Sequence, residues 1–233
     1  MAGIIRVDII SDIMCPWCFI GYRQLERALA ITGLKADIRW HPFELNPGMG
    51  PEGQDVTEHI REKYGATPEQ SAAARSQMAS IAEPLGIVFD RTPGRRIYNS
   101  FDAHQLLHWA KDSGRQTALK LALFDACLVR NDNVSDRNVL LAATDAAGLD
   151  REEAQAVLGD QRFASAVRAL EERWQEMNIS GVPAFILAER GLILGAQGEE
   201  RLAAALTKMA GLPPETVSQA GSASRPRPAG KTD

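Results

Sequence analysis

The chain has 233 residues, and its composition and charge exclude several classes of protein. With 45% apolar and 24% charged residues, it has the composition of an ordinary soluble globular protein, long enough for one large domain or two small ones. The net charge of −4 argues against nucleic acid as the main partner, and no apolar run approaches the ~20 residues of a membrane span. The segment Met1–Arg6 lacks the pattern of a signal peptide, so we expect a cytoplasmic protein.

The most informative motif is Cys15-Pro16-Trp17-Cys18. The apolar run Ile4–Ile10 before it predicts a buried strand, and Phe19–Ala30 after it has the spacing of an amphipathic helix. A Cys-x-x-Cys pair between a strand and a helix is typical of thioredoxin-like redox sites. The helix N-terminus favours the thiolate of Cys15, and Cys18 lies within reach to resolve a mixed disulfide formed there.

Two other uses of this cysteine pair are possible in principle. A structural zinc site needs four ligands, but the only other cysteine is Cys127, and no histidine pair follows at zinc-finger spacing. A structural disulfide is not expected in a cytoplasmic chain with three cysteines and a core of this size. The pattern therefore favours a redox-active pair and no metal.

Further along the chain, Ala36–Phe43 alternates apolar and polar residues as a strand does, and Glu44–Pro51 has the composition of a loop. From Asp55 to Met177 the pattern is helical and predicts about six helices. That region shows no convincing strand, apart from a possible short extended piece at Ile87–Phe89. Helix starts are predicted by capping patterns, which are Asp55 with Glu58, Thr67 with Gln70, Asn99 with Asp102 and Asp150 with Glu153.

Strand character returns near the end of the chain. The segments Val182–Leu187 and Leu192–Leu194, with a turn between them, predict a hairpin, and Glu199–Ala210 predicts a last helix. Beyond Leu212 the chain is rich in Pro, Ser, Ala and Gly, which predicts disorder. We therefore expect an α/β fold: a split thioredoxin-like domain (residues 1–54 and 178–212), a helical insertion (55–177) that covers the Cys15 end of the sheet, and a disordered tail (213–233).

The segment Val182-Pro183 is informative only in combination with the cysteine motif. The combination resembles the DsbA-like branch of the thioredoxin superfamily, in which a helical domain splits the fold and such a dipeptide opposes the cysteines. The resemblance is stronger to the FrnE-like oxidoreductases and dithiol-disulfide isomerases, and it covers roughly residues 5 to 205. The matching segments are Ser11–Gly21, Phe43–Pro47, Asn99–His104, Ala122–Phe124, Gly181–Pro183 and Gly195–Gln197.

The resemblance implies a set of site residues. Cys15 and Cys18 would be catalytic, the Val182–Pro183 bond would be cis, the Val182 backbone would pair with the substrate, and Pro183 would pack against the disulfide. Trp17 brings no positive charge to stabilise a thiolate, so we expect a less oxidising protein than periplasmic DsbA. The full expected substrate-binding set is Pro16, Trp17, Asn99, His104, Val182 and Pro183.

Six residues outside the cysteine motif, among them His104 of the set above, have the chemistry of a site. Cys127 follows Leu123 at helical spacing, which favours a place in the core. His104 and His108 are one helical turn apart, but no third ligand is evident, so we expect them to be structural or to line a cleft. Asp12 is either a proton acceptor for the cysteines or a polar cap. Glu44 and Asn46, in the loop after the second strand, are weaker candidates to reach the pocket.

These observations predict a thiol-disulfide oxidoreductase acting on a protein or small molecule that carries a disulfide or dithiol. No tightly bound cofactor is expected; glutathione is a candidate co-substrate, and a homodimer is one possible assembly. One alternative is a glutathione-dependent isomerase or transferase, of the 2-hydroxychromene-2-carboxylate isomerase or kappa type. Those proteins generally have serine where this chain has Cys15. A second alternative is a non-catalytic ligand-binding protein.

Overall fold

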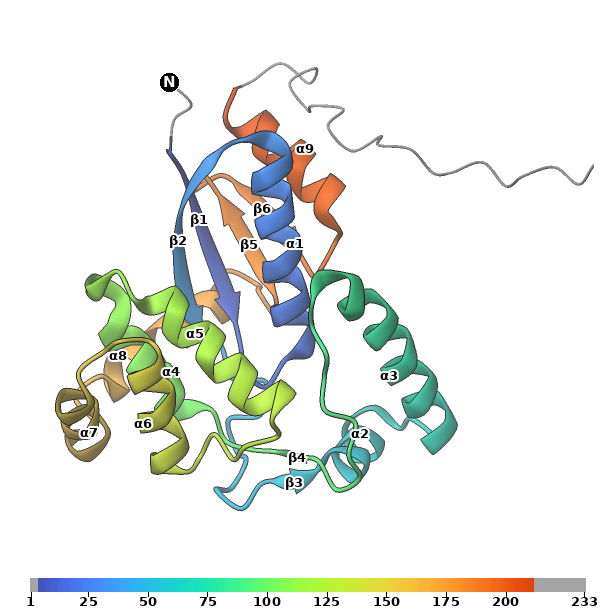
Figure 1. The fold of residues 1–233 in the computed structure, drawn as a ribbon, viewed down its shortest axis with the longest axis vertical. Helices are drawn as coiled ribbons and strands as arrows, with labels where there is room; N and C mark the ends of the chain where they lie inside the picture. Colours follow the sequence, from blue (N-terminus) through green and yellow to red (C-terminus); the bar gives the residue numbers. More distant parts are fainter. Residues whose placement is uncertain (1–3, 212–233) are drawn as a thin grey trace, which may run out of the picture.

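The computed structural model describes residues 4–211 (Figure 1). A four-stranded mixed sheet lies beside a large group of helices, and two further helices cover one face of the sheet. The predicted α/β fold with a large helical insertion is confirmed. The strands are β1 (Ile4–Ser11), β2 (Lys35–Pro42), β3 (Gln54–Asp55), β4 (Arg96–Ile97), β5 (Ala184–Leu187) and β6 (Gly191–Leu194). The helices are α1 (Pro16–Thr32), α2 (Val56–Tyr64), α3 (Pro68–Ala82), α4 (Phe101–Trp109), α5 (Gln116–Phe124), α6 (Arg137–Ala146), α7 (Arg151–Asp160), α8 (Ala164–Glu176) and α9 (Glu199–Met209).

The sheet joins the two ends of the described chain. Its strand order is β2-β1-β5-β6; β1 and β2 are parallel, and the β1–β5 and β5–β6 pairs are antiparallel. The predicted hairpin and last helix are both present, as β5, β6 and α9. This topology places the end of β1, which leads into the cysteine motif, next to the start of β5.

Each face of the sheet packs against helices because the central strand is apolar on both sides. Val7 and Ile9 of β1 belong to the main hydrophobic cluster, which also includes residues of α1, α5 and α9. Ile10 points to the opposite face, where it belongs to a smaller cluster with Trp174 of α8. The sheet end that carries the cysteines is thereby buried between helices from distant parts of the sequence.

Between residues 55 and 177 the structure contains seven α-helices, α2–α8, close to the predicted number of about six. Short 3-10 turns, η1 (Glu83–Leu85) and η2 (Ala110–Ser113), follow α3 and α4, and a π-helical turn, η3 (Asp125–Val129), extends α5. The predicted extended piece at Ile87–Phe89 is not a strand. It alternates buried and exposed side chains as a strand does, but no neighbouring strand pairs with it. Instead, the two-residue strands β3 and β4, absent from the prediction, pair with each other.

Most of the predicted helix starts are confirmed. Asp55 accepts hydrogen bonds from two backbone N–H groups of α2, Thr67 forms a capping box with Gln70, and Asp150 caps α7. The predicted cap at Asn99 is wrong by one residue, because α4 begins after Ser100. No helix within residues 4–211 is long and apolar enough to cross a membrane. The predicted disordered tail lies outside the described residues, and the proposed domain boundaries stay a prediction.

Candidate functional site

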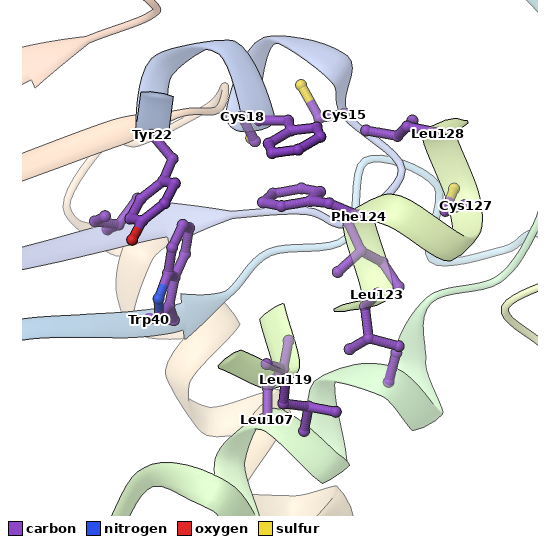
Figure 2. Packing of buried hydrophobic residues seen from close by; sticks show 14 of the residues in the cluster. Cys15, Cys18, Tyr22, Trp40, Leu107, Leu119, Leu123, Phe124, Cys127 and Leu128 are labelled. Carbon is purple, nitrogen blue, oxygen red and sulfur yellow. The ribbon is translucent and has the colours of Figure 1, made fainter. Parts of the chain in front are cut away.

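The two cysteines of the motif lie in the first turn of α1. Cys15 is the N-cap residue, Pro16 occupies the first helical position, and the Cys18 N–H donates to the Cys15 carbonyl oxygen at 3.0 Å. Both thiols are free, and both side chains are buried: Cys15 is 5% exposed and Cys18 is fully buried. Figure 2 shows the Cys15 sulfur pointing away from Phe124. Cys15 is therefore the more accessible of the two thiols, next to the unpaired N–H groups of a helix N-terminus.

The segment before β5 lies against Cys15. The Cys15 thiol donates a hydrogen bond to the Val182 carbonyl oxygen at 3.7 Å, across 167 residues of sequence. The Val182–Pro183 bond is cis, as the family resemblance predicts. Pro183 also approaches α1 closely, because a Cβ on Gly21 would lie 3.1 Å from the Pro183 ring. The structure therefore brings Cys15, Pro16, Val182 and Pro183 of the predicted set together.

On its other side the cysteine turn packs against the helical region. The rings of Phe19 and Phe124 stack with 5.0 Å between their centroids. Figure 2 shows the Phe124 ring beside the cysteine turn. Phe89 meets the same Phe19 ring edge-on at 6.5 Å. Burial raises the pKa of Cys18 well above its usual value, and the neighbouring Cys15 raises it further. At rest Cys18 is consequently a protonated thiol, and it needs a proton acceptor before it can attack a disulfide.

A buried lysine, which the sequence analysis did not single out, lies on this side of the pair. Lys120 of α5 is fully buried, and its Nζ donates to the carbonyl oxygen of Ser11 at 3.5 Å. Burial lowers its pKa to about 8, although Cys18 and Asp12 favour the charged form. Its burial could have been predicted from its spacing, because Lys120 lies on the same helix face as the apolar residues Leu123 and Phe124, three and four positions later.

Asp12 holds the loop that carries the cysteines. Its Oδ1 accepts the N–H of Met14 at 3.1 Å, its Oδ2 accepts the N–H of Leu45 at 2.8 Å, and its carbonyl oxygen accepts the N–H of Cys15. His104 Nε2 lies 3.6 Å from Oδ1. Burial alone would raise the pKa of Asp12, but His104 and the two N–H donors outweigh burial and lower it. Of the two predicted roles, these contacts favour the polar cap.

Two cavities flank this region. One, of about 420 Å³, lies between β2, α4 and α8 and is lined by both His104 and His108. The other, of about 510 Å³, lies between α2, α3 and residues 89–95, and Pro16 borders it. The predicted site residue Asn99 borders neither cavity: its side-chain amide donates to the Met49 carbonyl, and its oxygen accepts the Phe101 N–H. These contacts give Asn99 a loop-bracing position.

The remaining candidates lie outside the thiol pair. Cys127 is buried, with its sulfur 3.3 Å from that of Met14, and burial raises its pKa to about 12, so its predicted place in the core is confirmed. Glu44 pairs with Arg168, and Asn46 accepts a hydrogen bond from Lys63. Trp17 is partly buried against the main cluster. Within residues 4–211 no group of three His, Cys, Asp or Glu side chains is placed to hold a metal ion.

Comparison with known proteins identifies a family and several structures with the same fold. The model of the DSBA-like thioredoxin domain family matches residues 6–207. A probable DsbA oxidoreductase from Streptomyces coelicolor superposes with a TM-score of 0.81 at 37% identity, covering 89% of this chain and 90% of the other. A 2-hydroxychromene-2-carboxylate isomerase (TM-score 0.67, 16% identity, 88% and 95% covered) shares the fold. So does the cytosolic disulfide reductase DsbM from Pseudomonas aeruginosa with GSH (TM-score 0.55, 20% identity, 88% and 96% covered). The chain belongs to the DsbA-like thioredoxin domain family.

Proposed function

We propose that this protein is a thiol-disulfide oxidoreductase that uses Cys15 as nucleophile and Cys18 as resolving thiol. The observation that carries the proposal is the position of two free thiols in one helical turn, with the outer one against Val182. The fold and family membership support it, because the family includes oxidoreductases. The substrate is a disulfide or dithiol; a cytoplasmic setting, glutathione as co-substrate and a homodimer stay predictions from the sequence.

The reaction consists of two exchanges of sulfur–sulfur bonds. In the first, the Cys15 thiolate attacks a substrate disulfide, forms a mixed disulfide and releases the first substrate thiolate. In the second, Cys18 loses its proton and attacks Cys15 Sγ, which releases the second substrate thiolate and forms the Cys15–Cys18 disulfide. The substrate gains two electrons and the cysteine pair loses two. The reverse sequence oxidises a dithiol.

The Val182 carbonyl supports this assignment. It accepts a hydrogen bond from the Cys15 thiol. Backbone groups of an irregular segment beside a nucleophile are available to pair with an extended peptide or thiol ligand, since they are not all used in the sheet. Cys15 therefore lies next to backbone groups that are available to a ligand, whereas Cys18 lies in the core.

The test is equilibration in graded glutathione redox buffers, followed by alkylation of free thiols under denaturing conditions and intact-mass analysis. We expect two alkylation sites to be lost together at one midpoint, while Cys127 stays reduced. Cys15→Ser should abolish the exchange, and Cys18→Ser should accumulate a mixed disulfide. If both cysteines stay reduced in every buffer, the proposal is wrong.

A glutathione-dependent isomerase is the second candidate, favoured by the fold shared with 2-hydroxychromene-2-carboxylate isomerase. In that reading a serine in place of Cys15 leaves glutathione to supply the sulfur. Glutathione-dependent isomerisation of a 2-hydroxychromene carboxylate by Cys15→Ser, together with absent redox cycling in the wild type, would favour this candidate over the first.

A further inference from the structure

A lysine buried without a carboxylate partner needs an explanation. Lys120 is fully buried, and no salt bridge in the described part of the chain includes it. Its Nζ lies 4.9 Å from the ring centroid of Phe124 and 5.2 Å from that of Trp40, and one hydrogen bond of 3.5 Å reaches Ser11. An unpaired ammonium in such surroundings is energetically unfavourable, and the lysine avoids this cost when it gives up its proton.

The position of Lys120 connects it to the thiol pair. Ser11, whose carbonyl it holds, is the last residue of β1, four residues before Cys15. Phe124, which covers its amine, also stacks on Phe19, the residue next to Cys18. Among the charged or titratable neighbours of Lys120, Cys18 has the largest influence on its pKa. The amine and the Cys18 thiol are therefore both fully buried and close enough to influence each other's charge.

We propose that the neutral amine of Lys120 is the proton acceptor for Cys18 when Cys18 resolves the mixed disulfide. This inference rests on the proposed function. The amine takes the proton of the Cys18 thiol and becomes an ammonium, while the thiolate forms the bond to Cys15 Sγ. The bond from Cys15 to the substrate sulfur breaks, and the substrate leaves as a thiolate. The ammonium returns its proton to the leaving thiolate or to water, so the amine is restored.

The chemical properties of the two groups fit the transfer. Burial lowers the pKa of Lys120 to about 8, so about a tenth of the amine is neutral at pH 7 and about half at pH 8. Burial also raises the pKa of Cys18, and the charge of Lys120 acts against that rise. A proton moved from Cys18 to the neutral amine turns two neutral groups into an ammonium and a thiolate, and their mutual attraction offsets part of the cost of burying the two charges. Asp12, the nearest carboxylate, already accepts two backbone N–H groups.

The experiment follows resolution directly. The reduced protein is mixed with oxidised glutathione and quenched with acid, and the glutathione adduct on Cys15 is followed by intact mass from pH 6 to 10. In Lys120→Met we expect the adduct to accumulate and its resolution to slow by roughly 100-fold, the scale of a positioned general base. In the wild type the rate should rise to a plateau near pH 8; in the variant it should keep rising to higher pH.

Two variants serve as controls. Cys127→Ala removes another buried thiol, from the π-turn η3 that follows α5, and Lys208→Met removes one positive charge from an exposed position on α9. Both should resolve the adduct at the wild-type rate. If Lys120→Met fails to fold, the wild-type profile decides: a rate that rises without a plateau through pH 10 overturns the inference.

The outcomes separate this inference from the proposed function. A wild-type chain that forms no adduct, or never resolves one, overturns both. A wild-type chain that cycles normally beside a folded Lys120→Met variant with the same rate and the same pH profile overturns only the role of Lys120. A slower rate with an unchanged pH profile also overturns it, because a structural disturbance lowers the rate without moving the titration.

Discussion

The cysteine turn lies between two regions that differ in chemistry. On one side, the segment before β5 offers a backbone carbonyl and a proline ring to Cys15, and Val182 is only partly buried. On the other side, helix α5 offers the fully buried ring of Phe124 and the amine of Lys120. Under the mechanism proposed above, the β5 side would control how a substrate meets Cys15, and the helical side would control the protonation of Cys18. Single substitutions can disturb either side of the cysteine turn separately.

The largest effect is expected from Phe124→Ala on the helical side. Phe124 is fully buried, stacks on Phe19 and meets Trp40 edge-on at 6.1 Å. Loss of a buried phenyl ring costs about 3–5 kcal/mol, and here it also uncovers the amine of Lys120 to water. We expect that loss in the free energy of unfolding by urea, together with a rise of the Lys120 pKa towards its ordinary value.

The matched control is Phe89→Ala. Phe89 contacts the same Phe19 ring edge-on but lies on the outer side of the cluster at 9% exposure. It should lose less stability than Phe124→Ala and leave the pH profile of resolution unchanged. Equal losses in the free energy of unfolding would show that Phe124, which contacts Lys120, contributes no more to stability than Phe89 at the edge of the cluster.

A smaller effect is expected from Asp12→Asn, which removes the charge that links α4 to the cysteine loop. The pKa of Asp12 is lowered in the folded state, because His104 and two N–H donors outweigh its burial. Its contribution to stability is therefore present above the unfolded value of about 3.9 and is lost as the pH falls through the lower, folded value. We expect a loss of about 1.5–3 kcal/mol at pH 7 that shrinks in acid, measured by urea unfolding.

Asp8→Asn provides the comparison for this variant. Asp8, in β1, is also a buried carboxylate, and its pKa is lowered because hydrogen bonds from His41 and Arg6 outweigh burial. It should show the same type of acid dependence. Only Asp12→Asn should accelerate hydrogen exchange at the Met14 and Leu45 amides, because both amides donate hydrogen bonds to the Asp12 carboxylate. Faster exchange at both amides in Asp8→Asn would contradict the local role of Asp12.

The sequence predicted the β5 side of the site better than the helical side. The motif at Cys15, the strand periodicity and the Val182–Pro183 segment are local patterns, and the resemblance joined them correctly. Lys120 was missed because lysine in a helical pattern is usually solvated, and only tertiary packing removes water from this one. Asn99 was expected at the site on resemblance alone, but its side chain is occupied by the loop at Met49.

The helical region illustrates the same limit. Capping residues such as Thr67 and Asp150 mark helix starts through local hydrogen bonds, so they are readable from sequence. The strands β3 and β4 are two residues each and exist only because two distant segments meet, so no local pattern predicts them. Ile87–Phe89 has the alternation of a strand and lacks a partner, which the sequence does not reveal.

The smallest effect is expected from Gly21→Ala, which disturbs the β5 side. A Cβ at Gly21 would lie 3.0 Å from the Phe185 ring and 3.1 Å from the Pro183 ring, so α1 has to move away from the segment that holds Cys15. Overpacking of this kind costs about 1–3 kcal/mol, of which the helix preference of alanine returns part. Gly159→Ala in α7 is the control, since its Cβ meets nothing within 4 Å, and it should gain about 0.5–1 kcal/mol. Because the strain falls beside Cys15 and not beside Lys120, Gly21→Ala should slow adduct formation with oxidised glutathione and leave the pH profile of resolution unchanged. A shifted resolution profile in Gly21→Ala would mean that the two sides of the cysteine turn do not act separately.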